Sequence, residues 1–369
     1  MNALITANVD SDGIDRLERL GLDVEYRPIG EREGRLPPVE MEELIEGVSV
    51  LVVGYEGVSA DIMDAADSLE VIACPRGGPE ANIDIEAAAE RAIPVLYAPG
   101  RNAVSVADFT IGLVVAVARY VPQAHHQLHE GTYTGEPRGD AASGGGERED
   151  VTWGIAKGSP YMAFKGPELS GKRLGIVGLG AIGQLVAKRA AGFDMEVVAY
   201  DPFVDDESMA EHGARKVELN ELLEGSDVVT LHSPVTEGTR GMIGPEEFER
   251  MKESAYFVNT ARAALTDQNA LVRELESGGI QGAALDVYAD EPLPADHPLL
   301  GMANVVTTPH IAGAAEEVPA RGAAMVVDGI EALYEDREPA HVANPAALSG
   351  FDSKGFAART DANTTEGKR

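Results

Sequence analysis

Short apolar runs alternate with amphipathic segments along the first hundred residues of the chain. The apolar runs lie at 3–6, 24–26, 48–53, 71–74 and 95–96, and helical patterns lie between them at 13–20, 41–46, 61–66 and 84–91. Strands that alternate with helices are typical of a parallel sheet covered by helices on both faces. The pattern therefore predicts a doubly wound α/β domain, without a glycine-rich motif after its first strand.

A second series of apolar runs follows between residues 174 and 307. Six strands are expected here, at 174–177, 195–200, 228–231, 256–259, 283–287 and 305–307. Six parallel strands form a complete dinucleotide-binding domain. We therefore predict a second doubly wound domain, which a helix at 316–334 follows.

Three segments depart from this alternation. Residues 103–119 are apolar almost all round a helix, which predicts burial between domains or between subunits. Residues 131–160 are rich in Gly, Ser and charge, so we expect a flexible loop or an arm that crosses to another subunit. The polar residues from 346 to 369 have few apolar side chains and should form a disordered tail.

A glycine-rich motif, Gly178-Leu179-Gly180-Ala181-Ile182-Gly183, links the strand at 174–177 to a helix at 182–191. Gly178 allows a tight turn, Gly180 lets the backbone approach a pyrophosphate, and Gly183 lets the helix pack on the strand. The pyrophosphate would lie at the helix N-terminus, where free N–H groups favour an anion. The motif predicts a dinucleotide site.

Asp201 ends the next strand, eighteen positions after Gly183. Its carboxylate can accept hydrogen bonds from a ribose 2′-OH and would repel a 2′-phosphate. No Arg occurs in the ten residues that follow it. The predicted cofactor is therefore NAD rather than NADP.

The chain of 369 residues has 62 acidic and 30 basic residues, for a formal net charge of −32. This charge argues against nucleic acid or an anionic membrane as a partner. The acids are dispersed along the chain, which favours adaptation to a salt-rich cytoplasm over a merely acidic surface. Cys74 is the one cysteine, so an inert core thiol in a reducing cytoplasm is expected. No apolar run reaches the roughly 18 residues that a membrane span needs.

Histidines 125, 126 and 129 precede the arm without acidic or Cys ligands at a supporting spacing. A solvated helix end is favoured over a metal cluster, and we expect no metal.

Polar residues follow the strand ends of the second domain, where this fold places its ligands. They include Arg262, Asp286, Glu291 and His310. The chain resembles the D-isomer-specific 2-hydroxyacid dehydrogenase family. The resemblance lies in the order of Arg262, Glu291 and His310 downstream of the glycine motif. Further motifs carry the resemblance over about 48–345: RGGPEANIDIEAAAERAIPV, GRNAVSVAD, LHSPVTEGTRGMI, VNTARAAL, AALDVYADEPLP and TPHIAG.

Oxidation of a 2-hydroxy acid requires removal of the hydroxyl proton while C2 delivers a hydride to nicotinamide. A histidine suits the proton step near neutral pH, and we assign it to His310. Glu291 would orient the imidazole and stabilise its protonated form. Arg262 would bind the substrate carboxylate through its planar guanidinium and polarise the carbonyl oxygen.

The resemblance implies further contacts. The substrate carboxylate would rest on the backbone N–H groups of Arg76, Gly77 and Gly78, with Asn102 nearby. Asp286 would accept the nicotinamide carboxamide, Thr260 would line the nicotinamide ribose, and Pro234 and Thr239 the adenosine side. Other expected cofactor contacts are Ala181, Ile182, Ala261, Gly313 and His232, the last of which could equally be structural.

The resemblance also implies that a Rossmann NAD domain (103–316, with the arm at 121–170) is inserted into a flavodoxin-like substrate domain (1–102 and 317–345). The two would close on NAD by a hinge motion, and the helix at 103–119 would form a homodimer interface. Three positions depart from the family pattern: Ala263, Asp108 and Ala315. The sequence therefore does not assign a particular 2-hydroxy acid as the substrate.

Two other functions stay open. One is a non-catalytic NAD-sensing protein, similar to the corepressors that share this fold. The other is a formate or phosphite dehydrogenase, although formate enzymes usually have Gln where this chain has Glu291.

Overall fold

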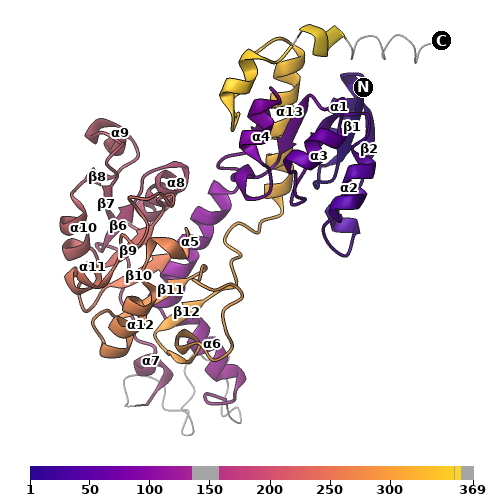
Figure 1. Cartoon of the computed structure of the whole chain (residues 1–369). Helices are drawn as coiled ribbons and strands as arrows, with labels where there is room; N and C mark the ends of the chain where they lie inside the picture. Colours follow the sequence, from indigo (N-terminus) through magenta and orange to yellow (C-terminus); the bar gives the residue numbers. More distant parts are fainter. Residues whose placement is uncertain (135–157, 353, 359–369) are drawn as a thin grey trace, which may run out of the picture. The chain divides into compact units, whose positions relative to one another are not determined.

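The computed structural model describes residues 1–134, 158–352 and 354–358. The chain forms two compact units (Figure 1), Met1–Asn102 with Ala315–Arg369 (unit 1) and Ala103–Ala314 (unit 2). The boundaries expected from the sequence were 102/103 and 316/317.

Unit 1 contains a five-stranded parallel sheet in the order β2-β1-β3-β4-β5. This is the flavodoxin-like order, in which the strand sequence reverses between β1 and β3. Every residue of β3 and β4 is buried, because helices cover both faces of the sheet. The strands are β1 Asn2–Ile5, β2 Asp23–Tyr26, β3 Val48–Val52, β4 Val71–Cys74 and β5 Val95–Tyr97; the helices are α1 Ser11–Arg19, α2 Pro38–Leu44, α3 Ala60–Ala65, α4 Ile85–Glu90 and α13 Glu317–Tyr334.

Unit 2 contains a seven-stranded parallel sheet in the order β12-β11-β10-β9-β6-β7-β8. This order contains the dinucleotide-binding arrangement, with its reversal between β6 and β9. Its strands are β6 Arg173–Val177, β7 Glu196–Tyr200, β8 Arg215–Lys216, β9 Val228–Leu231, β10 Tyr256–Asn259, β11 Gly282–Leu285 and β12 Val305–Thr307. Its helices are α5 Ala103–Ala118, α6 Val121–His129, α7 Pro160–Ala163, α8 Ala181–Ala191, α9 Asp206–Glu211, α10 Leu219–Gly225, α11 Pro245–Arg250 and α12 Gln268–Ser277.

The expected number of six strands in this sheet was wrong. The seventh strand, β8, has only two residues, Arg215 and Lys216, and pairs with β7 at the edge of the sheet. A short polar edge strand has no apolar run, so no hydrophobic pattern could indicate it.

Helix α5 is buried, as its apolar composition predicted. It packs within unit 2 against α8 and the strands β10 and β11. Contacts within unit 2 therefore account for this burial, and a homodimer interface at α5 stays a prediction. No single helix among the described residues is long and apolar enough to cross a membrane, and α5 and α6 meet that test only as a pair, bent by 64°.

The expected disorder of residues 346–369 was wrong for the first part of this segment. Pro345–Ser349 form a 3-10 helix, residues 354–358 are helical, and Phe356 is fully buried against Phe351 and α13 residues of the unit 1 core. Residues 359–369 and most of the expected arm, 135–157, lie outside the described residues.

Candidate active site

The glycine motif forms the loop between β6 and α8. Gly178 has φ +94, and a Cβ there would lie 2.6 Å from the Ser233 hydroxyl. A Cβ on Gly183 would lie 2.3 Å from the carbonyl oxygen of Gly178, whereas the space in front of Gly180 is open. Glycine is thus required for packing at two positions, and the third leaves room for a ligand.

Gly180 is also the N-cap of α8, and no side chain caps this end of the helix. Ala181 and Ile182 occupy the first helical positions, where backbone N–H groups lack intrahelical acceptors. Open space beside uncapped N–H groups fits the pyrophosphate of a dinucleotide.

Asp201 lies at the end of β7 and is tied to the glycine loop. Its Oδ2 accepts a hydrogen bond from the Leu179 N–H at 2.9 Å, and its Oδ1 accepts one from the Phe203 N–H at 3.0 Å. These contacts fix a carboxylate beside the loop, which suits a ribose hydroxyl as its further partner.

His310 and Glu291 lie together, as the sequence predicted. The Nδ1 of His310 is 2.7 Å from the Oε2 of Glu291, and the other carboxylate oxygen accepts the Tyr288 N–H at 3.0 Å. Burial raises the pKa of Glu291, but the hydrogen bonds from His310 and Tyr288 and the nearby charge of Arg262 outweigh it and leave this pKa below its usual value. Glu291 is therefore ionised at neutral pH, and the Nε2 of His310 is the ring atom available to a substrate.

Asp286 holds the loop that carries His310. His310 has φ +57, a left-handed conformation that is costly for a residue with a side chain. The fully buried carboxylate of Asp286 accepts hydrogen bonds from the Thr308 hydroxyl and from the N–H groups of Ile311 and Ala312, at 2.6–2.9 Å. Sequence reasoning missed this positioning role, and the proposed nicotinamide contact of Asp286 stays a prediction.

Arg262 extends from the loop after β10 and is exposed. Its Nη1 donates to the carbonyl oxygen of Ala261 at 2.7 Å. Asn259, at the end of β10, donates to the Arg262 carbonyl oxygen at 3.0 Å and accepts the Ala261 N–H at the same distance. Asn259 is thus a second positioning residue that was missed, because a buried Asn at a strand end has no distinctive sequence signal.

Other expected cofactor residues differ in accessibility. The Thr260 side chain is buried against Thr110 of α5, 2.8 Å between the hydroxyls. The Thr239 hydroxyl donates to the Pro234 carbonyl oxygen at 2.6 Å, which closes the loop after β9. Gly313 follows the His310 loop and is half-buried.

His232 is buried beside the glycine loop. Its Nε2 is 3.1 Å from the Thr230 hydroxyl, and its buried Nδ1 has no partner among the described residues. Burial lowers the pKa of His232 to about 3, so the ring is neutral. The backbone of His232 approaches the glycine loop: its carbonyl carbon would lie 2.8 Å from a Cβ on Gly178.

The expected substrate residues of unit 1 follow β4. The N–H of Arg76 donates to the Cys74 carbonyl oxygen at 2.6 Å, and its contact with the substrate stays a prediction. The N–H groups of Gly77 and Gly78 have no acceptor among the described residues. Cys74 itself is buried, and burial raises the pKa of its thiol to about 11. Asn102 lies at the end of this part of unit 1.

No group of three or more His, Cys, Asp or Glu side chains that could hold a metal ion occurs in the part of the chain that the structure describes. In α6, the rings of His125 and His129 lie 4.2 Å apart, centroid to centroid.

Comparison with known proteins identifies the family. Residues 111–312 match "D-isomer specific 2-hydroxyacid dehydrogenase, NAD binding domain". The chain belongs to this family. The matched segment includes the glycine loop, Asp201, Arg262 and His310, so the predicted family, the two-domain α/β fold and NAD as cofactor are confirmed.

Relatives with several activities match most of the chain. A D-3-phosphoglycerate dehydrogenase of Archaeoglobus fulgidus is 38% identical over 86% of this chain and 54% of its own length. A glyoxylate reductase of Korarchaeum cryptofilum is 39% identical over 78% of this chain and 80% of its own. The chain thus spans about half the length of the former relative.

The crystal structure of the TT0316 protein from Thermus thermophilus is similar over 93% of this chain and 100% of that chain. The TM-score is 0.75 and the sequence identity is 35%.

Proposed function

We propose that this protein is an NAD-dependent oxidoreductase that interconverts a 2-hydroxy acid and a 2-keto acid. The observation that carries the proposal is the 2.7 Å contact between His310 and Glu291 inside the NAD-binding unit. Relatives named glyoxylate reductase, hydroxypyruvate reductase and D-3-phosphoglycerate dehydrogenase support small 2-keto acids as substrates.

His310 would transfer the proton of the reaction at its Nε2. In the oxidising direction this nitrogen accepts the proton of the substrate hydroxyl, and in the reducing direction it returns a proton to the keto oxygen. Glu291 holds Nδ1 and stabilises the imidazolium that forms, because its lowered pKa keeps it negative.

Arg262 and the loop after β4 would bind the substrate. The guanidinium of Arg262 is permanently charged and can donate two parallel hydrogen bonds to a carboxylate. The N–H groups of Gly77 and Gly78 are further donors, with no acceptor among the described residues. Both sets of donors suit the planar carboxylate that every 2-hydroxy acid carries.

NAD would be held by the glycine loop, the N-terminus of α8 and Asp201, and when bound it supplies the hydride acceptor or donor. Asp201 favours a free 2′-OH over a 2′-phosphate. Cytoplasmic localisation and a homodimer belong to the same proposal, and sedimentation of the full chain tests the latter.

The test is NADH oxidation with a panel of 2-keto acids: hydroxypyruvate, glyoxylate, pyruvate and 3-phosphohydroxypyruvate, each in low and in high salt. We expect at least one to be reduced. His310→Ala should lower kcat/KM by about 10²–10⁴-fold and leave NADH affinity within threefold of the parent. His212→Ala, which removes an exposed histidine of the same unit, should leave both unchanged.

Turnover that survives His310→Ala would reject the catalytic assignment. NADH binding without reduction of any keto acid would favour a non-catalytic NAD-sensing protein instead.

A further inference from the structure

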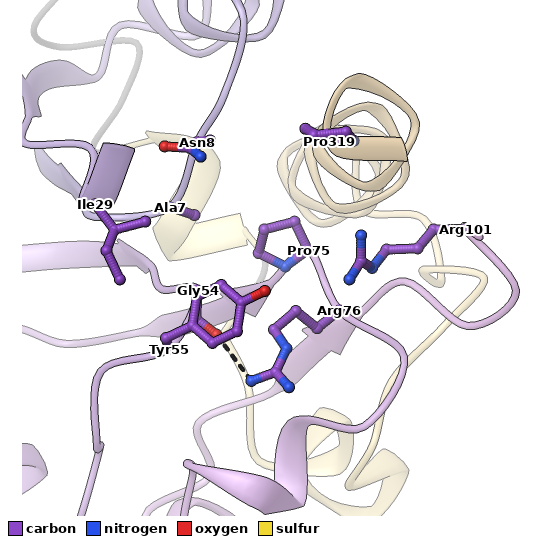
Figure 2. Close-up of a pocket in the computed structure, with 9 residues that line it drawn as sticks. All are labelled: Ala7, Asn8, Ile29, Gly54, Tyr55, Pro75, Arg76, Arg101 and Pro319. Carbon is purple, nitrogen blue, oxygen red and sulfur yellow. Dashed lines mark hydrogen bonds between the residues drawn. The ribbon is translucent and has the colours of Figure 1, made fainter. Parts of the chain in front are cut away.

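A pocket of unit 1 lies at the carboxyl ends of its strands (Figure 2). Ala7 and Asn8 follow β1, Gly54 and Tyr55 follow β3, and Pro75 and Arg76 follow β4; Ile29, Arg101 and Pro319 complete the lining. The order of the strands reverses between β1 and β3. Ligands of open α/β sheets bind at this kind of reversal, outside the carboxyl ends of the strands.

The pocket is positively charged although the chain as a whole is strongly acidic. Its lining contains two arginines, Arg76 and Arg101, and no carboxylate. Three other arginines of unit 1 have acidic partners: Arg16, Arg32 and Arg91 each form an ion pair with a carboxylate at 2.5–2.7 Å. The pocket therefore differs from the surroundings of these three arginines, because no carboxylate in its lining balances Arg76 and Arg101.

Of the two arginines, Arg101 has fewer hydrogen-bond partners. Its guanidinium has no hydrogen bond or ion pair with any described residue, although the side chain is half-buried. Burial and the neighbouring charge of Arg76 both lower the pKa of Arg101. A half-buried guanidinium beside a like charge is unfavourable unless an anion joins them.

The backbone of Arg101 is held in place by α13. Arg321 donates from Nη1 to the Arg101 carbonyl oxygen at 2.7 Å, and a Cβ on Gly322 would lie 3.0 Å from the Arg101 Cδ. Arg76 is held over the ring of Tyr55, 4.4 Å from its centroid, and donates to the Gly54 carbonyl oxygen at 3.3 Å. Figure 2 shows the Arg76 guanidinium beside the ring of Tyr55 and the Arg101 guanidinium on the side of Pro75.

We propose that this pocket binds a second anionic group of the substrate, a phosphate or a second carboxylate, with Arg101 and Arg76 as its ligands. The inference rests on the proposed function and narrows its substrate class to 2-hydroxy acids with two anionic groups. The N–H groups of Gly77 and Gly78, which follow Arg76 directly, remain for the carboxylate that every such acid carries. Arg101 is then a residue that determines specificity and takes no part in the proton step.

The experiment measures by calorimetry the affinity for hydroxy acids with two anionic groups, here called dianions, and for their counterparts with one, here called monoanions. NADH is present throughout, because it cannot oxidise either class. D-3-phosphoglycerate is paired with D-glycerate to test a phosphate, and D-malate with D-lactate to test a second carboxylate, all at one ionic strength. We expect the parent to bind at least one dianion about 10- to 100-fold more tightly than its counterpart.

Arg101→Met should remove this advantage. The loss of affinity should be at least tenfold smaller for the monoanions than for the dianion. Arg101→Lys should retain part of the preference for dianions, because the positive charge remains but the planar guanidinium, which can donate two parallel hydrogen bonds, is lost. Arg19→Met is the matched control: it deletes an exposed positive charge of the same unit and should preserve the full advantage.

Equal affinity of the parent for dianions and monoanions would overturn the proposal, and so would an equal loss for both classes in Arg101→Met. The proposed function fails separately if no 2-keto acid is reduced while the dianion preference and its dependence on Arg101 persist. In that case the pocket remains an anion site of a protein with another activity.

Discussion

The two units present different chemistry at equivalent edges of similar sheets. Both sheets are fully parallel, and each reverses its strand order once, between β1 and β3 in unit 1 and between β6 and β9 in unit 2. In unit 1 the carboxyl edge carries the permanent positive charges of Arg76 and Arg101. In unit 2 it carries the glycine loop and the titratable pair of His310 and Glu291.

The difference shows that one architecture can serve two tasks through the residues placed after its strands. Fixed charges recognise an anion at any pH but cannot exchange protons under ordinary conditions. An imidazole beside a carboxylate can exchange protons near neutral pH. We therefore expect substitutions in unit 2 to affect turnover of every substrate, and substitutions in the unit 1 pocket to affect the choice among substrates.

Among substitutions that leave His310, Glu291 and Arg262 in place, the largest effect is expected at Asp286. Asp286→Asn should lower kcat/KM by about 10- to 100-fold for every substrate, because an amide cannot accept all three hydrogen bonds that hold the His310 loop. Steady-state kinetics with a dianionic and a monoanionic keto acid would measure this.

Thr308→Val removes only one of those three hydrogen bonds and should have a clearly smaller effect. A loss in Asp286→Asn confined to one class of substrate would break the proposed division of tasks between the units.

A smaller effect is expected at Asp201. Asp201→Asn keeps an acceptor for the Leu179 N–H but removes the charge that opposes a 2′-phosphate. The ratio of kcat/KM for NADPH to that for NADH should rise roughly tenfold, which corresponds to about 1.4 kcal/mol.

Asp205→Asn removes an equally negative group four residues further on, at the N-cap of α9, and should leave the ratio unchanged. An equal rise in both variants would mean that net charge, and not the position of Asp201, selects the cofactor.

The smallest effect concerns the pH dependence of stability. The pKa of His232 is lowered to about 3 by burial, whereas an unfolded histidine titrates near 6.5. The unfolded state therefore binds this proton first, and the stability present above pH 6.5 is lost as the pH falls from about 6.5 towards 3. Between pH 7 and 5.5 the free energy of unfolding should fall by about 1 kcal/mol on this account.

Denaturant unfolding at both pH values, on the parent and on His232→Gln, measures the contribution. The exposed His126 gives the control His126→Gln, in which the parent's pH dependence should persist. An unchanged dependence in His232→Gln would show that His232 does not titrate with folding.

Local signals made much of unit 2 predictable. The glycine motif, Asp201 and the strand ends that carry Arg262 and His310 follow short apolar runs, and several of these runs coincide with the observed strands at Val228–Leu231, Tyr256–Asn259 and Val305–Thr307. The predictions failed where hydrophobicity was a poor guide: the polar strand β8, and the helix at 354–358, which Phe356 anchors in a polar segment. A single buried aromatic side chain can order a segment whose average composition indicates disorder.

The amino-acid sequence was sufficient to predict the family, the two parallel sheets, NAD as cofactor and the pairing of His310 with Glu291, because each depends on a contiguous motif or on residues placed directly after a strand. The positioning roles of Asp286 and Asn259 became visible only in the folded chain, because they consist of hydrogen bonds that Asp286 accepts from a distant loop and that Asn259 makes within the loop after β10. That Arg101 has no partner among the described residues could likewise be seen only in the folded chain. It depends on which side chains the separate strand ends bring together, and no acid lines this pocket.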